Sequence, residues 1–242
     1  MDKPLPQVLV GIPCGVRGGF RPFDAVLAQF LKVTPNATVA FAMTGVLPGA
    51  RNRIVREAIA GGYDYIWWLD DDQPFAPPDF QQLLAHNVDA VVPLSCRRGA
   101  PFLPLLYDEI AEDHARQHFL TDHEHGLIPV AAAGFAGLLI RTSCFTKMGV
   151  DGWFEFVHPP NNYDDYAEDF PFYRRLAEIG VQLYCDLDTR FGHAVTAVAY
   201  IVKQGGKWVT VLADHEPFVA FPQVAHPLTI AGRPSTGRVK IS

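Results

Sequence analysis

The chain has 242 residues, of which 49% are hydrophobic and 19% are charged. A chain of this length and composition can build one large core, which argues against global disorder. The net charge is −6 and no block of lysines and arginines stands out. This pattern argues against a protein whose main affinity is for the phosphates of nucleic acid.

The four cysteines are widely spaced, form no CxxC pair and lie in apolar, strand-like contexts. This spacing argues against a zinc cluster or a disulfide framework and indicates small core residues in a reducing compartment. The amino-terminal stretch lacks a signal-peptide pattern, and polar residues interrupt every long apolar run. We therefore expect a cytoplasmic protein without a membrane span.

The first hundred residues alternate short apolar runs with segments of helical periodicity. The apolar runs predict strands at Val8–Pro13, Thr38–Met43, Tyr65–Leu69 and Asp89–Leu94. The periodic segments predict helices at Phe23–Val33, Arg51–Ala60 and Pro78–His86, the second of which is stopped by Gly61 and Gly62. Such alternation is typical of an α/β fold with a mostly parallel sheet, which binds ligands outside the carboxyl ends of its strands.

The second half of the chain is less regular. Residues 101–125 predict a hairpin with surface loops, and residues 130–140 are small and apolar. Residues 170–179 predict an amphipathic helix, and residues 181–186 predict a strand. The pattern weakens after His193, and residues 227–242 predict a tail or arm. We expect one domain over residues 1–200 and a C-terminal extension over residues 201–242.

Three consecutive aspartates, Asp70 to Asp72, follow the strand predicted at Tyr65–Leu69. Like charges at the mouth of a core repel one another and lose water, so we expect a positive partner there. Two carboxylates one residue apart can bind Mg²⁺ or Mn²⁺, which prefer oxygen ligands and often share them with substrate phosphates. The alternative is a solvated acidic turn that caps the following helix.

Two later segments carry candidate residues with a structural alternative. Glu168 and Asp169 stand at the start of a predicted helix, where the helix dipole by itself favours acidic side chains. His193 ends the segment DTRFGH, where a lone histidine after glycine is more often structural than a ligand.

The order of the motifs resembles that of glycosyltransferases of the GT-A fold, which use nucleotide-diphosphate sugars. The resemblance runs from about Val8 to His193 and rests on ARNRIVREAI, WWLDDDQPFAPPDF, GFAGLLIRTSCFTKMG, GWFEF and AEDFPFYRRLAEIGVQLYCDLDTRFGH. The second segment resembles the DxD strand end, and the last resembles the xED helix with its closing histidine. The chain has AED where GED is common, which leaves the acids intact. Compact forms of this kind occur in bacterial and phage glycosyltransferases.

The resemblance implies a role for each matching residue. It implies Asp169 as the catalytic base of an inverting reaction, with Glu168 positioning it or the acceptor. It implies Asp70, Asp72 and His193 at a Mn²⁺ or Mg²⁺ ion. The residues implied at the donor are Pro13, Cys14, Arg51, Asp70 and Asp71. Those on the acceptor side are Gly134 and Trp153; the Trp153 and Phe154 rings either stack on a sugar or base or pack in the core.

The resemblance therefore implies a metal-dependent glycosyltransferase that uses a nucleotide-diphosphate sugar, with a UDP-sugar favoured. The acceptor hydroxyl can belong to a glycan, a protein, a small molecule or a modified DNA base. A nucleotidyltransferase is an alternative, because GVRGGFR, with Arg17 and Arg21, partly matches a glycine-rich basic signature. A hydrolase that uses Asp72 and Asp169 is also compatible with the motifs, as is a non-catalytic nucleotide-sugar-binding module.

Overall fold

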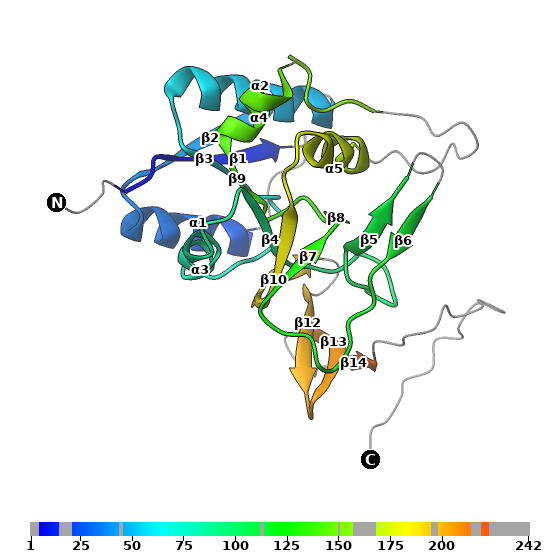
Figure 1. Ribbon diagram of the computed structural model, residues 1–242. Helices are drawn as coiled ribbons and strands as arrows, with labels where there is room; N and C mark the ends of the chain where they lie inside the picture. Colours follow the sequence, from blue (N-terminus) through cyan, green and yellow to red (C-terminus); the bar gives the residue numbers. More distant parts are fainter. Residues whose placement is uncertain are drawn as a thin grey trace.

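A seven-stranded sheet forms the middle layer of the structure (Figure 1). The computed structural model describes residues 5–14, 21–43, 46–111, 114–149, 151–156, 168–194, 198–213 and 219–222. In spatial order the strands are β2 (Ala37–Met43), β1 (Val8–Cys14), β3 (Tyr65–Trp68), β9 (Leu139–Arg141), β4 (Ala90–Leu94), β10 (Leu183–Arg190) and β7 (Leu127–Val130). Strands β9 and β7 run antiparallel to the others. The prediction of an α/β fold is confirmed. Five of the seven strands run in one direction, but three of the six neighbouring pairs are antiparallel, so the sheet is mixed.

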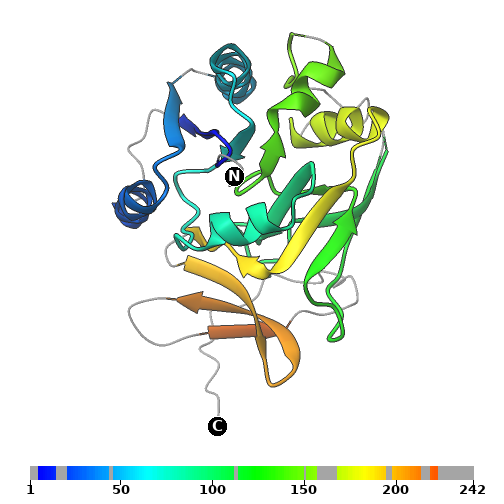
Figure 2. The same ribbon diagram turned by 60° about the vertical axis from the view of Figure 1, so that its left-hand side comes forward.

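Helices cover both faces of this sheet (Figures 1 and 2). Helices α1 (Arg21–Val33) and α3 (Asp79–Ala85) pack on one face, and their apolar side chains share a core with alternate residues of β1 and β3. Helices α2 (Leu47–Gly61), α4 (Thr142–Met148) and α5 (Asp169–Glu178) pack on the other face and share a second core. The four predicted helices are all present, with ends that differ by a few residues.

Strand β3 is buried along its whole length because it lies inside the sheet, with layers of helices on both faces. Successive side chains of a strand point to opposite faces. Trp67 accordingly packs against Phe30 of α1 and Phe80 of α3, with ring centroids 4.9 and 5.1 Å away. Trp68 points the other way, 5.4 Å from the Phe135 ring. This double burial holds the start of the acidic segment rigidly.

Helix α2 begins at Leu47, one turn before the predicted start at Arg51. The first turn contains Pro48, whose missing N–H costs nothing there because the first amides of a helix have no helical partner. The helix ends as predicted. Gly62 has a φ of 67°, and the N–H of Tyr63 donates to the carbonyl of Ala58 at 3.1 Å, as in a glycine-capped helix end.

The second half of the chain adds two smaller sheets. Strands β5 (Leu106–Ile110), β6 (Ala115–Gln117) and β8 (Ala132–Ala133) form the first, which confirms the hairpin predicted within residues 101–125. Strands β11 (His193–Ala194), β12 (Val198–Gln204), β13 (Lys207–Ala213) and β14 (Val219–Pro222) form the second, drawn mainly in orange in Figure 2. The sequence did not predict this antiparallel sheet.

The expected domain boundary between residues 200 and 201 falls inside β12, which pairs with β11 on one side and β13 on the other. The indole of Trp208 on β13 is buried and donates to the carbonyl of Thr121 at 2.9 Å. The described residues from 198 to 222 therefore belong to a sheet that packs on the main body, while residues 227–242 lie outside the described residues. Within the described ranges, no helix has both the length and the apolar character needed to cross a membrane.

Candidate functional site

The carboxyl ends of the parallel strands lie at one edge of the main sheet, and most of the predicted residues follow these ends. Cys14 ends β1, the three aspartates follow β3, and Arg97 and Arg98 follow β4. After β10, the N–H of Phe191 donates to the carbonyl of Leu94 at 2.9 Å. The chain then crosses from the end of β4 toward the segment after β3, which delivers His193 to the aspartates.

Asp72 and His193 meet at this edge. Their Oδ2 and Nε2 atoms lie 3.8 Å apart, and the backbone N–H of Ala194 donates to the Asp72 carbonyl at 2.8 Å. The Nδ1 atom of His193 is 2.8 Å from the carbonyl oxygen of Cys96. Because a carbonyl only accepts, Nδ1 carries the proton, and in the neutral ring Nε2 keeps a lone pair that can accept a hydrogen bond or bind a cation.

Arg98 supplies a positive charge at the same place. Its Nη2 atom is hydrogen-bonded to Oδ2 of Asp72, and its Nε donates to Nε2 of His193 at 3.2 Å. The sequence interpretation did not single out Arg98. The available signal was the Arg-Arg-Gly run shortly after the strand predicted at Asp89–Leu94, because that strand ends at the ligand-binding edge of the sheet.

A second cluster surrounds the buried guanidinium of Arg51 on α2. Its Nη1 atom donates to Glu168 at 2.7 Å and to Asp169 at 2.6 Å, at the start of α5. The guanidinium also lies 3.9 Å from the centre of the Phe135 ring, a cation–π contact. Burial by itself lowers the pKa of Arg51, but Asp169, Asp70 and Glu168 outweigh it, so the pKa is raised. The two acids therefore serve a buried ion pair as well as the helix start.

Asp70 lies between the two clusters. Burial raises the pKa of Asp70 from its usual 3.8 to about 6, and the charges of Asp72, Asp169 and Asp71 add to the rise, whereas Arg51 opposes it. The pKa of Glu168 is also raised, first by burial and then by the charge of Asp169. The edge thus concentrates acids beyond what its arginines neutralise, and an additional cation would be attracted there.

The predicted donor residues occupy the neighbouring part of the edge. Pro13 is buried within β1, and Cys14 at its end is half-buried. Burial raises the pKa of the Cys14 thiol, and the charges of Asp71 and Asp24 raise it further. The pKa of Asp71 is raised by burial and then by Asp72. The glycine-rich segment with Arg17 lies outside the described residues.

The predicted acceptor residues are buried. Trp153 is 5% exposed, packs edge-on against Phe145 and donates its indole N–H to the Phe145 carbonyl at 2.9 Å. Phe154 is 2% exposed. The structure therefore favours core packing over sugar stacking for both rings. A Cβ added at Gly134 would lie 2.9 Å from a Leu105 methyl carbon, so this glycine permits a close approach of two segments.

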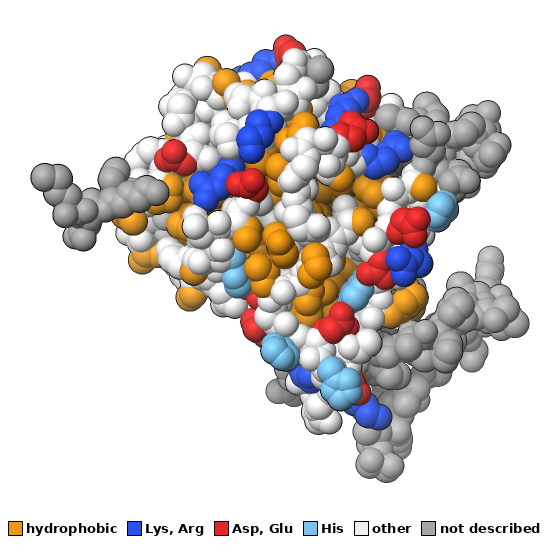
Figure 3. Space-filling model, in the orientation of Figure 1, with side chains coloured by type: hydrophobic (Ala, Val, Ile, Leu, Met, Phe, Trp, Pro, Cys, Tyr) orange, Lys and Arg blue, Asp and Glu red, His pale blue; other side chains and the backbone are white. Residues whose placement is uncertain are grey.

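A cavity of about 800 Å³ lies elsewhere, and neither Asp72 nor His193 lines it. It is bordered by α5, β5, β7 and the start of β10. Figure 3 shows hydrophobic side chains gathered near the middle of this face, with charged side chains around them. The lining includes the start of β10 and part of α5, whereas the three aspartates follow the carboxyl end of β3. We place the candidate site at the aspartates, where the titratable groups converge.

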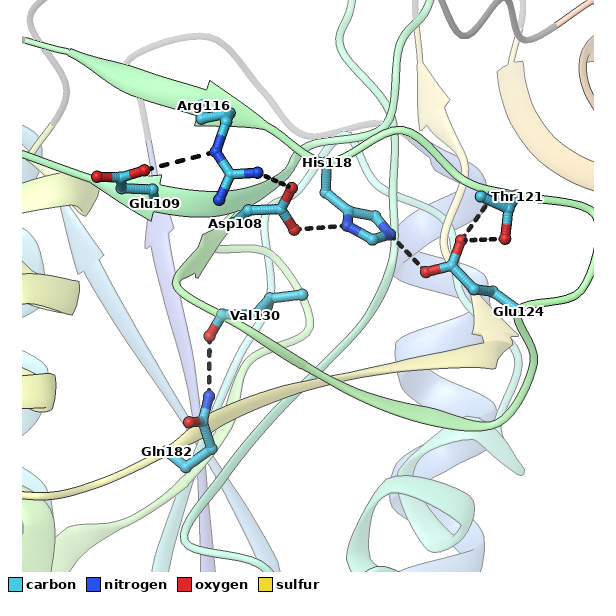
Figure 4. Close-up of polar contacts among 8 residues, drawn as sticks. All are labelled: Asp108, Glu109, Arg116, His118, Thr121, Glu124, Val130 and Gln182. Carbon is cyan, nitrogen blue, oxygen red and sulfur yellow. Dashed lines mark hydrogen bonds and ion pairs between the residues drawn. The ribbon is translucent and has the colours of Figure 1, made fainter.

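Two acids on the rim of this cavity, Asp108 and Glu109, are paired with basic side chains on or just after β6 (Figure 4). His118 stands between two carboxylates, 2.6 Å from Asp108 and 2.8 Å from Glu124. Arg116 lies 3.3 Å from Asp108 and 3.4 Å from Glu109. Asp108 and Glu109 therefore form ion pairs that link the two strands of the hairpin, which is a structural role.

Comparisons with known proteins give similarity of fold alone. No family model matches the sequence, and no curated protein matches it. Among solved structures, the crystal structure of A197 from STIV is similar, with a TM-score of 0.53 and 16% identity. The match covers 94% of this chain and 100% of that chain. An identity this low supports a shared chain path and carries no information on ligands or activity.

Proposed function

We propose that this protein is a glycosyltransferase of the GT-A fold that transfers a sugar from a nucleotide-diphosphate sugar to an acceptor hydroxyl. The observation that carries the proposal is the approach of Asp72 and His193, whose Oδ2 and Nε2 atoms are 3.8 Å apart. The motif resemblance requires these two residues to meet, although they are far apart in the sequence. Asp70 links this pair to the acids at the start of α5, because the charges of both Asp72 and Asp169 raise its pKa.

The residues at this edge fit a loosely held divalent cation. No group of three or more His, Cys, Asp or Glu side chains within the described ranges is arranged to hold a metal. Asp72 and His193 would supply two donors and leave positions for diphosphate oxygens. The imidazole donor favours Mn²⁺ over Mg²⁺. When bound, the cation would act as a Lewis acid that stabilises the charge on the departing diphosphate.

The two acids of α5 differ in a way that supports different roles. The Asp169 side chain is 26% exposed, whereas the Glu168 side chain is 9% exposed. Asp169 can therefore reach an acceptor hydroxyl and take its proton as the new bond forms. Arg51 orients this carboxylate, and Glu168 completes the buried ion pair that fixes Arg51. Glu168 is thus a positioning residue in this proposal.

The test is calorimetric titration of UDP and GDP with Mn²⁺, followed by a panel of nucleotide sugars assayed for slow hydrolysis. We expect metal-dependent nucleotide binding in the wild type and its loss in Asp72→Ala. Asp89→Ala is the matched control, because Asp89 precedes β4 at the opposite edge of the sheet, where it pairs with Arg141 at 3.1 Å. The proposal would be contradicted if the wild type showed no metal-dependent nucleotide binding and no hydrolysis of any nucleotide sugar. Release of pyrophosphate from a nucleoside triphosphate would instead favour a nucleotidyltransferase.

A further inference from the structure

Resting on the proposed function, we propose that Arg98 holds the place of the cation between Asp72 and His193 and moves to the donor diphosphate when metal and donor bind. Arg98 is then a positioning residue that exchanges one set of anionic partners for another. Asp72 and His193 are the partners it leaves, and the phosphates are the partners it gains.

The contacts of Arg98 coincide with the lone pairs that a metal would need. Its guanidinium is hydrogen-bonded to Oδ2 of Asp72, and its Nε lies 3.2 Å from Nε2 of His193. A lone pair that accepts a hydrogen bond from Arg98 cannot coordinate a cation at the same time. Because Nε2 of His193 has only one lone pair, coordination of a cation by His193 excludes its contact with Arg98. Asp72 has further lone pairs, but a cation bound to it would repel the guanidinium.

Exposure decides which group moves. The Arg98 side chain is 64% exposed, whereas Asp72 and His193 are 27% and 9% exposed. The imidazole is also fixed by the Cys96 carbonyl, and the Asp72 backbone by the N–H of Ala194. An exposed arginine can leave without opening the core, so it is the group that gives way while the two donors stay in position.

The chemistry of the guanidinium identifies its second partner. Arg98 would be repelled from Asp72 and His193 if these two residues held a divalent cation. The diphosphate bound to that cation brings new negative charge within reach. Arginine binds phosphate oxygens through paired, charge-assisted hydrogen bonds, which are stronger than neutral ones. Arg98 therefore adds affinity for the diphosphate only after it has released Asp72.

The neighbouring arginine provides a matched control. Arg97 has the same charge and lies one residue earlier, but its Nη2 atom donates to the Tyr107 hydroxyl at 3.0 Å on β5. It thus contacts a different element of the fold. Substitution of Arg97 removes one positive charge from the same loop without removing the competitor for the metal.

The first experiment uses Mn²⁺ alone, measured by the electron paramagnetic resonance of the unbound ion, with wild type, Arg98→Ala and Arg97→Ala. Removing an exposed ion pair should strengthen Mn²⁺ binding by Arg98→Ala about 2- to 5-fold. Arg97→Ala should bind Mn²⁺ as the wild type does. Equal or weaker Mn²⁺ binding by Arg98→Ala would overturn the exchange. Thermal melting of each variant checks that the fold is intact.

The second experiment titrates UDP in the presence of saturating Mn²⁺. Arg98→Ala should bind UDP at least about 10-fold more weakly, the loss expected for charged hydrogen bonds to phosphate. Unchanged UDP binding by Arg98→Ala, with metal-dependent binding intact in the wild type, would overturn this inference and leave the proposed function standing. If the wild type binds no nucleotide, the proposed function fails and so does the diphosphate role of Arg98, whereas the Mn²⁺ experiment still decides the competition.

Discussion

Replacing Asp70 with asparagine should stabilise the protein while weakening donor binding. The pKa of Asp70 is raised from 3.8 to about 6, chiefly because burial disfavours the charged form. The folded protein therefore holds the Asp70 proton more tightly than the unfolded chain does. Between these two pKa values the folded state binds more protons, so the contribution of Asp70 to stability falls as the pH rises.

The size of the effect follows from the two pKa values. A rise from 3.8 to about 6 corresponds to about 3 kcal/mol of destabilisation once the carboxylate is ionised in both states. The penalty is absent below the unfolded pKa and complete above the folded one. Asp70→Asn should thus raise the free energy of unfolding by about 3 kcal/mol near pH 8, but by only about 1 kcal/mol near pH 4.5.

Urea unfolding followed by tryptophan fluorescence measures this difference at both pH values. All four tryptophans lie in described segments and are buried, so their emission reports loss of the core. Asp188→Asn, at an exposed aspartate of β10, is the control and should change stability by less than about 0.5 kcal/mol. A gain for Asp70→Asn that is the same at both pH values, or a loss near pH 8, would refute the electrostatic reasoning. A parallel fall in UDP affinity would indicate that the charge of Asp70, which destabilises the fold, contributes to donor binding.

Three further substitutions test other parts of the structure. Arg51→Met should lower the free energy of unfolding, measured by urea titration, by about 3–5 kcal/mol, because Glu168 is left buried without its cation. The double variant that also carries Glu168→Gln should recover part of that loss. Asp169→Asn should keep nucleotide binding but lower the turnover number about 100-fold or more; a normal rate would remove its assignment as the base. Gly137→Ala should cost about 2 kcal/mol or more, because φ is 83° and the new Cβ would lie 2.3 Å from a proline ring, whereas Gly126→Ala, with φ 66° and open space, should cost about 1 kcal/mol by thermal melting.

The elements of the main sheet were predictable because their signals are local. Residues 65–68 form an uninterrupted apolar run, and the structure buries all four in β3. The Gly61-Gly62 stop also acts within a few residues, since only a residue that tolerates positive φ ends α2 in this way. Periodicity and capping depend on neighbours in the chain, so they can be recognised without knowledge of the tertiary fold.

The hairpin of β12 and β13 shows a local signal that was overlooked. Gly205 and Gly206 have φ values of 59° and 82°, as a two-residue hairpin turn requires. Two glycines between the β-prone runs VAYIVKQ and KWVTVLA are a hairpin signature. The expected boundary between residues 200 and 201 falls inside the first of these two runs.

The sequence by itself determined which residues could carry chemistry and at which strand ends they stand: the aspartates after β3, the acids at the start of α5, and His193. Only the tertiary structure decided which of them meet. His193 reaches Asp72 because β10 pairs with β4 and the following segment bonds back to residues 72 and 74. The tertiary structure also directs Arg98 toward the aspartates and Trp153 into the core. The reason is that such contacts depend on strand order and packing across the whole chain, which periodicity over a few residues does not encode.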